Sequence, residues 1–241
     1  MRVATEETPL GFLATPAEGG AAPGVVMVHD VWGLSDHTRD LARRLATEGL
    51  AVLAVDLYRR EAAVEIRDPG AWMRSLSDPQ VLDDLGAAGA ALAERPECSG
   101  RVGVVGFCMG GSYALMAACQ DRGFAAAVPF YGLLSHAHGL LHDPEGQDPA
   151  HKPREPLAMA PELGCPLLAF FGDRDEFVPL DDVRALERAL APAAAGAEVV
   201  IVPGAGHAFM NDTRPEAFQP EAAERAWRRM LEFLKNRLGA G

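Results

Sequence analysis

Short apolar runs alternate with longer amphipathic segments along most of the chain, and this alternation restricts the folds that the chain can adopt. The apolar runs cover residues 10–15, 24–29, 51–56, 102–107, 126–131, 166–171 and 198–203. Most contain hardly any polar residue, which is typical of parallel strands that helices cover on both faces. Helices are predicted at 36–49, 79–95, 181–190 and 220–238. The pattern favours an α/β fold with a mostly parallel central sheet and helices on both faces.

One segment, residues 136–161, departs from this pattern. It contains four histidines and five prolines and shows little periodicity. Long irregular segments inside compact domains are usually lids or binding loops, and we predict that role here. The chain shows no repeats and no shift in composition, and its 241 residues, 49% of them hydrophobic, can bury a sizeable core. We therefore expect a single domain over residues 1–241.

The net charge of the chain limits the classes of partner that it can bind. The formal net charge is −12, from 22 basic and 34 acidic residues, and there is no basic run. Such a surface repels nucleic acid and anionic lipid headgroups. The first residues lack the basic-then-apolar pattern of a signal peptide, and no apolar stretch approaches the roughly 20 residues that a membrane helix needs. We expect a cytoplasmic monomer or homodimer that binds a small molecule, and neither nucleic acid nor membranes.

The four cysteines, at 98, 108, 119 and 165, contain no CxxC pair and are too sparse for a disulfide framework. Three of them, Cys98, Cys119 and Cys165, are interpreted as buried packing thiols. His136 and His138 form a weak metal-binding pattern without carboxylates at helical spacing, and residues 103–111 do not spell a GxGxxG phosphate loop. We expect no metal and no cofactor.

Cys108 has a different setting, between the predicted strand 102–107 and a helix that begins near Gly110. A sharp turn from strand to helix, called a nucleophile elbow, presents one side chain at the carboxyl end of a sheet. Glycines at 106 and 110 suit such a turn because bulkier residues would collide there. The positive end of the following helix favours the thiolate. The same kind of turn also occurs without chemistry, so a nucleophile at Cys108 requires a base and an acid elsewhere.

Both groups follow later strands, in the order nucleophile, acid, base that such elbows require. Asp175 comes shortly after strand 166–171, and His207 comes shortly after strand 198–203. The carboxyl ends of parallel strands meet at one edge of a sheet, where α/β proteins bind ligands. His207 is therefore the candidate base for Cys108, and Asp175 is the carboxylate that would orient the imidazole. Taken separately, each could be an ordinary loop residue.

Stabilising the negative oxygen of a tetrahedral intermediate requires two backbone N–H donors. One normally comes from the residue after the nucleophile, which here is Met109, and the other from an early loop. The loop 29–34 makes the amide of Val31 the candidate second donor. Aromatic side chains are predicted to line the pocket: Trp32, Phe107, Phe177 and Phe209. Core packing is the alternative interpretation for each of these four.

The chain resembles the dienelactone hydrolase (carboxymethylenebutenolidase) family of α/β hydrolases over essentially its whole length. The matching segments are HDVWGL at 29–34, DHTRDLARRLATEG at 36–49, VDLY at 55–58, GFCMGG at 106–111, GDRDEFVP at 172–179 and GHAF at 206–209. The resemblance implies the α/β-hydrolase fold and a triad of Cys108, Asp175 and His207. It also implies that Asp30, where dienelactone-cleaving members carry glutamate, modulates the thiol.

The chain departs from the family at two arginines that bind the carboxylate of the dienelactone. Glu65 aligns with one position, which Arg67 or Arg74 could supply only after a shift of register, and Asn211 stands at the other. Losing two charge-assisted contacts would weaken the binding of a carboxylate substrate. The reaction class is therefore carried over, while a neutral or bulkier ester, lactone or thioester is at least as good a candidate substrate as the dienelactone carboxylate.

The predicted function is the cleavage of an ester or lactone by a cysteine nucleophile, through a thioester acyl-enzyme. The alternative is a catalytically inactive α/β-hydrolase-fold protein that binds a ligand or a partner, because a triad that is complete in the sequence need not be assembled in space.

Overall fold

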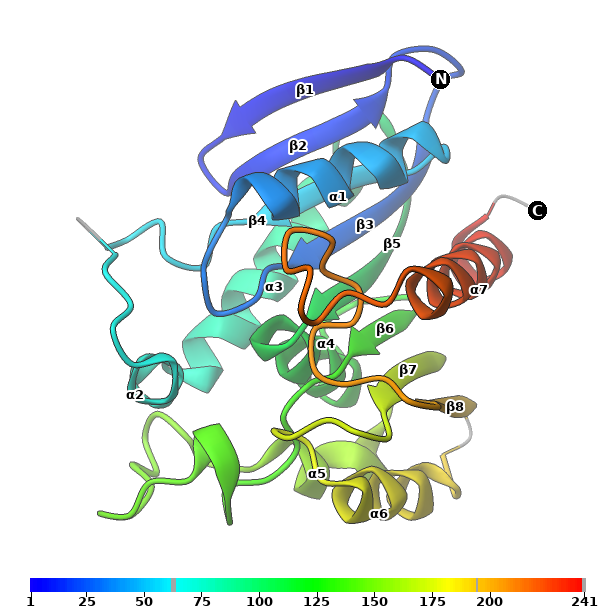
Figure 1. Ribbon diagram of the computed structural model, residues 1–241. Helices are drawn as coiled ribbons and strands as arrows, with labels where there is room; N and C mark the ends of the chain where they lie inside the picture. Colours follow the sequence, from blue (N-terminus) through cyan, green and yellow to red (C-terminus); the bar gives the residue numbers. More distant parts are fainter. Residues whose placement is uncertain (62–63, 194, 240–241) are drawn as a thin grey trace.

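The computed structural model describes residues 1–61, 64–193 and 195–239. Its centre is an eight-stranded sheet with the order β1-β2-β4-β3-β5-β6-β7-β8 (Figure 1). The strands are β1 (Val3–Thr8), β2 (Gly11–Pro16), β3 (Ala22–Val28), β4 (Ala51–Val55), β5 (Cys98–Phe107), β6 (Ala127–Phe130), β7 (Leu167–Gly172) and β8 (Ala197–Val202). Strands β3 to β8 pair in parallel, whereas β1 and β2 are antiparallel. The predicted mostly parallel sheet is confirmed.

The N-terminus corrects one prediction, because the first strand is β1 rather than the run 10–15, which forms β2. Strand β1 pairs with β2 in antiparallel register, from Val3 opposite Pro16 to Thr8 opposite Gly11. Its central residues, including Glu6 and Glu7, are exposed. Because this edge strand buries few side chains, its sequence is not an apolar run. The hydrophobic pattern therefore did not indicate it.

The helices lie on both faces of the sheet, as predicted. They are α1 (Asp36–Thr47), α2 (Pro69–Ser75), α3 (Asp78–Ala93), α4 (Met109–Cys119), α5 (Pro156–Met159), α6 (Leu180–Leu190) and α7 (Pro220–Leu238). Helix α1 begins where the Ser35 side chain caps the amide of Thr38, and Asp36 in its first turn suits the positive end of the helix. The predictions missed α2 and α5, which are short.

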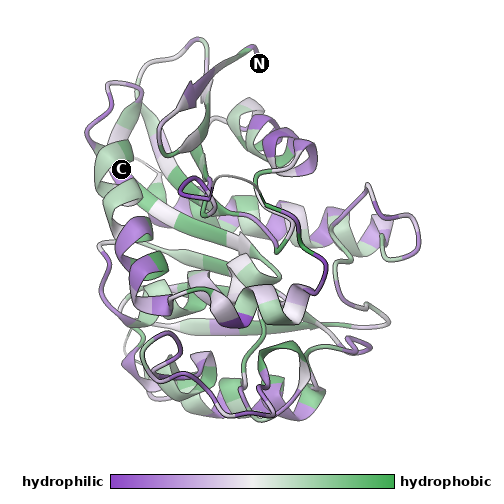
Figure 2. Ribbon diagram, turned by 90° about the vertical axis from the view of Figure 1, so that its left-hand side faces the viewer, coloured by the Kyte–Doolittle hydropathy of each residue, from purple (hydrophilic) through white to green (hydrophobic). Residues whose placement is uncertain are grey.

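Two apolar layers separate the sheet from these helices, and alternate residues of each inner strand supply them. In β3, Val25 and Met27 pack in the layer that contains Leu45 of α1 and Leu234 of α7. Val26 and Val28 of the same strand pack in the opposite layer, which contains residues of α3, α4 and α6. Figure 2 shows these hydrophobic strands inside the molecule, with hydrophilic residues on its outer helices and loops. The inner strands of the sheet are therefore covered on both faces, and a functional site can form at the carboxyl ends of its parallel strands.

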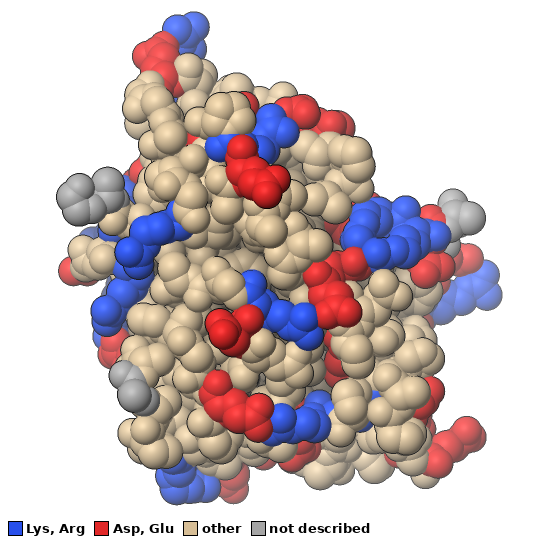
Figure 3. Space-filling view, turned by 180° about the vertical axis from the view of Figure 1, so that it is seen from behind, with Lys and Arg blue, Asp and Glu red and all other residues tan. Residues whose placement is uncertain are grey.

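The outer surface mixes charges of both signs. On the face shown in Figure 3, Lys and Arg side chains lie beside Asp and Glu side chains. Arg122 pairs with Asp83, and Arg154 pairs with Glu162, across exposed positions. Among the residues described, no helix combines the length and the apolar character that crossing a membrane requires.

Segment 136–161 contains two short 3-10 helices, η1 (Gly139–Leu141) and η2 (Ala160–Glu162), as well as α5. The buried Lys152 ammonium lies 2.5 Å from the Asp78 carboxylate at the start of α3. The Asp78 amide donates to the carbonyl of His151 at 2.8 Å, and His138 pairs with Asp182 of α6. These contacts fasten the segment to the helices beneath it, and its role as a lid stays a prediction.

Candidate active site

Cys108 lies at the turn between β5 and α4, as the elbow prediction requires. Its backbone has φ 53° and ψ −118°, in the region that residues other than glycine rarely adopt. Its amide donates to the carbonyl of Phe130 at 3.0 Å, which ties the turn to β6. A Cβ atom at Gly106 would overlap the carbonyl of Gly110, and one at Gly110 would overlap the carbonyl of Val28. The turn can therefore form only with glycine at both positions.

Asp175 and His207 are joined by a hydrogen bond, although they are far apart in the sequence. Nδ1 of His207 lies 2.8 Å from Oδ2 of Asp175, whose side chain is completely buried. The other carboxylate oxygen accepts the amides of Phe177 and Val178, at 2.8 and 3.1 Å. The carboxylate is thereby fixed, and it assigns the proton to Nδ1 and directs Nε2 away from itself.

The second ring nitrogen of His207, Nε2, lies on the edge of the imidazole away from Asp175. Nε2 of His207 is buried and has no hydrogen-bond partner among the described residues. Burial alone lowers the pKa of His207, but the neighbouring Cys108 sulfur and the Asp175 carboxylate outweigh it and raise this pKa to about 10. The imidazole is therefore held as an imidazolium when the sulfur beside it is a thiolate.

Cys108 and His207 line one cavity, whose empty space of about 410 Å³ includes open solvent at its mouth. Its walls also contain Asp30, Trp32, His37, Thr38, Leu41, Phe107, Tyr131, Ala208, Asn211 and Arg214. Of the four predicted pocket aromatics, Trp32 and Phe107 are in this wall. The other two are not among its lining residues: Phe209 lies in the core, and Phe177 packs edge-on against the ring of His207, 5.0 Å between centroids.

The role of Val31 and Met109 as oxyanion donors stays a prediction. In the described part of the chain, the Val31 amide donates to no acceptor. Met109 is the first residue of α4, where a backbone N–H has no acceptor inside its own helix. The positive end of α4 adds to the attraction of these amides for a negative oxygen.

Asp30 lies in the cavity wall, but its carboxylate is engaged by its own loop. Oδ1 of Asp30 accepts the amide of Trp32 at 2.9 Å. No hydrogen bond joins the described atoms of Asp30 and Cys108, in keeping with a side chain one methylene shorter than glutamate. Control of the thiol by Asp30 stays a prediction.

The remaining cysteines have the environment of packing thiols. Cys98, Cys119 and Cys165 are buried and free. Burial raises the pKa of Cys119 to about 12 and that of Cys165 to about 11. These two thiols resist ionisation, as buried packing thiols do.

Tyr131 and Arg214 are among the cavity residues that the sequence did not predict. Tyr131 follows β6 and has a strained backbone with φ 38°, and its ring lies 5.0 Å from that of His207. Its place after a parallel strand could have indicated it, by the rule that indicated His207. Arg214 lies over the ring of Trp32 at 5.5 Å and pairs with no carboxylate among the described residues. Arg214 lies in a stretch of turns that returns to the cavity. Because turns have no sequence periodicity, no pattern indicated this residue.

The arginines considered from the sequence are engaged elsewhere. Arg67 pairs with Glu65 on the surface, and Arg74 donates to the carbonyl of Leu140 at 3.0 Å. Neither lines the cavity of Cys108. Asn211 does line it, and its side-chain oxygen Oδ1 accepts hydrogen bonds from the amide and the hydroxyl of Thr213.

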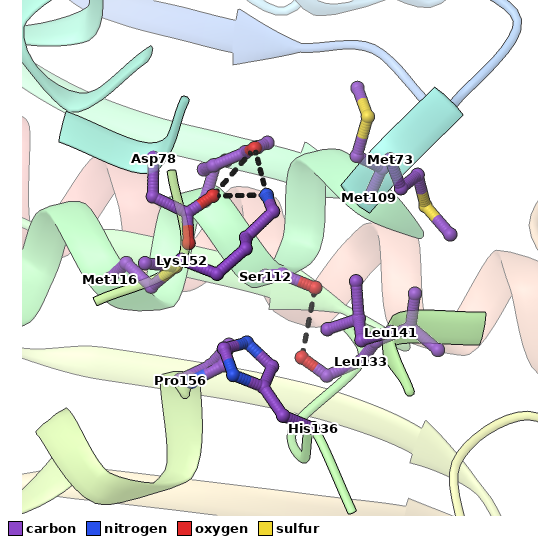
Figure 4. A pocket seen from close by; sticks show the side chains of 11 residues that line it. Met73, Asp78, Met109, Ser112, Met116, Leu133, His136, Leu141, Lys152 and Pro156 are labelled. Atoms are coloured by element: carbon purple, nitrogen blue, oxygen red, sulfur yellow. Dashed lines mark hydrogen bonds and ion pairs between the residues drawn. The ribbon is translucent and has the colours of Figure 1, made fainter. Parts of the chain in front are cut away.

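A second cavity, shown in Figure 4, has Met109 in its wall and contains a buried polar cluster. The Tyr113 hydroxyl donates to the Asp78 carboxylate at 2.9 Å, and the Lys152 ammonium donates to the same oxygen. His136 also lines this cavity. Among the described residues, no group of three or more His, Cys, Asp or Glu side chains could hold a metal ion.

Known proteins resemble this chain over nearly all of its length. The model of the "Dienelactone hydrolase family" matches residues 10–238. A protein of Escherichia coli (strain K12) named "Putative carboxymethylenebutenolidase" is 31% identical, over 93% of this chain and 86% of its own. A Bradyrhizobium protein named "Probable 2-oxo-3-(5-oxofuran-2-ylidene)propanoate lactonase" is 30% identical, over 95% of this chain and 90% of its own.

A solved structure shares the same architecture. The crystal structure of a protein described as "Putative Dienelactone Hydrolase", from Klebsiella pneumoniae subsp. pneumoniae MGH 78578, has a TM-score of 0.84 and 31% sequence identity. The match covers 97% of this chain and 98% of that one. The chain therefore belongs to the dienelactone hydrolase family, and it has the α/β-hydrolase fold.

Proposed function

We propose that this protein is a cysteine hydrolase that cleaves a small ester or lactone through a thioester acyl-enzyme. The observation that carries the proposal is the cavity in which Cys108, on its elbow, meets the free edge of an imidazole that Asp175 orients. The names of the carboxymethylenebutenolidase and lactonase relatives support an ester or lactone as substrate.

The reaction begins with attack of the Cys108 thiolate on the substrate carbonyl carbon. The amides of Val31 and Met109 hold the negative oxygen of the tetrahedral intermediate. As the carbon–oxygen bond to the leaving group breaks, the His207 imidazolium donates its proton to the departing oxygen, and a thioester remains on Cys108. His207 then takes a proton from water, the hydroxide attacks the thioester, and the acid leaves as the thiolate is restored.

The acyl-enzyme provides the direct test. After mixing with a p-nitrophenyl ester, intact-protein mass spectrometry is expected to show one added acyl group, which peptide mapping assigns to Cys108. The variant Cys108→Ala should show neither the adduct nor turnover. Cys119→Ala, in the same helix, should retain both, because that thiol is buried and disfavours the thiolate. Full turnover by Cys108→Ala would contradict the mechanism.

The same experiment separates an enzyme from an inactive binding protein. A binding protein would neither turn over nor become acylated by any member of a panel of esters, lactones and thioesters. The free edge of His207 and the two unengaged amides favour the enzyme, because a protein that only binds a ligand has no need of a proton-transfer group beside a thiol.

Arg214 supports a substrate that carries a negative charge. Its half-buried guanidinium faces the cavity of a chain whose net charge is −12, and no carboxylate among the described residues neutralises it. Arg214→Met is expected to raise KM for an ester that bears a carboxylate by about 10- to 100-fold, the value of one charge-assisted hydrogen bond. KM for the matched neutral ester should stay within about twofold. Steady-state kinetics on the two esters measure both values.

The control for this experiment is Arg225→Met, which removes an exposed arginine of α7. It should leave both KM values unchanged. If Arg214→Met raised KM equally for the charged and the neutral ester, Arg214 would shape the cavity without binding the negative charge. The preferred substrate would then be neutral.

A further inference from the structure

Tyr58 connects Val31 and Met109, the two residues whose amides are proposed to hold the oxyanion. It lies just beyond the carboxyl end of β4 and is buried. Its hydroxyl donates to the carbonyl of Val31 at 2.8 Å, and it lies 3.5 Å from the sulfur of Met109. These contacts join the loop after β3 to the first residue of α4, which the backbone does not connect directly.

Other contacts brace the same loop from the end of β4. The Leu57 amide donates to Nε2 of His29 at 3.1 Å, and the ring of Tyr58 packs edge-on against that of His29. A Cβ atom at Gly33 would contact the Tyr58 ring at 3.1 Å, so the loop also lies directly against this ring. The loop that carries Val31 is therefore supported on the ring and the hydroxyl of one side chain.

Tyr58 is suited to a structural hydroxyl rather than to acid–base chemistry. It is not among the residues that line the cavity of Cys108. Burial raises the pKa of Tyr58, so that its hydroxyl keeps its proton across the working pH range and stays a donor. The ring of Trp72 packs edge-on against it at 5.3 Å and limits its movement.

We propose that Tyr58 is a positioning residue, which fixes the separation and direction of the Val31 and Met109 amides so that both meet the developing oxyanion. The inference rests on the proposed function, because it assigns these amides to the tetrahedral intermediate. Donors of this kind stabilise a transition state only when they are already aligned, and removing one of them lowers kcat by about 10² to 10³. Misalignment of both, with both still present, should cost part of this factor.

The test is Tyr58→Phe, which removes the hydroxyl and keeps the ring. We expect kcat for ester hydrolysis to fall by about 10- to 100-fold while KM changes by less than about threefold, since displacement of reacting groups by about 1 Å can cost a factor of 10². An aldehyde analogue of the substrate, which adds to Cys108 and places an oxyanion in the hole, should bind more weakly by a factor similar to the fall in kcat/KM. If Tyr58 only supported the fold, the fall in kcat/KM and the loss of affinity for the aldehyde would not be of similar size.

Tyr113→Phe is the matched control. Its hydroxyl is also buried: it donates to Asp78 at 2.9 Å and accepts from Lys152 at 3.3 Å, and among the described residues no hydrogen bond joins it to Val31 or Met109. Both variants should lose a comparable free energy of unfolding, and only Tyr58→Phe should lose kcat and inhibitor affinity. Unchanged kcat in Tyr58→Phe, with Cys108→Ala inactive, would overturn this inference alone, whereas an active Cys108→Ala would overturn the proposed function.

Discussion

The variant His207→Gln is expected to lower kcat/KM by about 10⁴-fold, because it removes the group that moves every proton in the proposed reaction. Glutamine fills most of the space of the imidazole and can still reach Asp175, so the fold should be retained. Alkylation of Cys108 by iodoacetamide at neutral pH should also slow, since the thiolate would lose its cationic partner. Steady-state kinetics and timed labelling measure the two effects. Activity within tenfold of the parent would exclude His207 as the base.

The same variant tests the protonation state of the imidazole in the free protein. The pKa of His207 is raised from 6.5 to about 10. Protonation of His207 therefore contributes stability that is fully present below pH 6.5 and is lost as the pH rises through about 10. The difference in free energy of unfolding between parent and His207→Gln should shrink across this window. A constant difference from pH 6 to pH 10 would contradict the raised pKa, and subtraction removes the titration of groups that do not interact with His207.

The variant Lys152→Met is expected to lower the free energy of unfolding by about 3–5 kcal/mol, the usual cost of leaving one member of a buried ion pair without its partner. The side chains of Lys152 and Asp78 are each only 4% exposed. Without the ammonium, the Asp78 carboxylate would keep only the Tyr113 hydroxyl and its place at the start of α3. Urea denaturation at neutral pH measures the change.

Two controls separate loss of the pair from loss of one side chain. The double variant Lys152→Met with Asp78→Asn should recover most of the stability, because no charge is then buried and the Tyr113 hydroxyl keeps an acceptor. Lys235→Met removes an exposed lysine that pairs with Glu48, and it should cost less than about 1 kcal/mol. A loss below about 1 kcal/mol in Lys152→Met would mean that the pair does not hold segment 136–161 in place.

The sequence predicted the arrangement of Cys108, Asp175 and His207 because each follows a parallel strand, namely β5, β7 or β8. Apolar runs identify such strands, and parallel pairing brings their carboxyl ends to one edge whatever the details of packing. The Asp175–His207 hydrogen bond and the cavity shared by Cys108 and His207 agree with this rule. The catalytic roles of the three residues stay predictions until the variants are measured.

The residues that were missed depend on side-chain packing between distant segments. Arg214 reaches the cavity because it lies over Trp32, and Tyr58 reaches Val31 and Met109 across two loop ends. No periodic pattern indicates either contact, and the VDLY match at 55–58 includes Tyr58 without indicating what its hydroxyl contacts. Phe209 was predicted to line the pocket, with core packing as the alternative, and it packs in the core; the strained backbone at Ala208, with φ 59°, lies between it and His207.

The elbow at Cys108 also determines which positions of the site can be substituted during evolution. Serine has the shape of cysteine and would need no new backbone geometry at position 108, so the attacking atom itself could be exchanged by a single substitution. Gly106 and Gly110 have no such freedom, since any side chain there would meet a main-chain carbonyl. The nucleophile can therefore change during evolution, while the two glycines beside it cannot. In distant relatives, these glycines would identify the site more reliably than the nucleophile does.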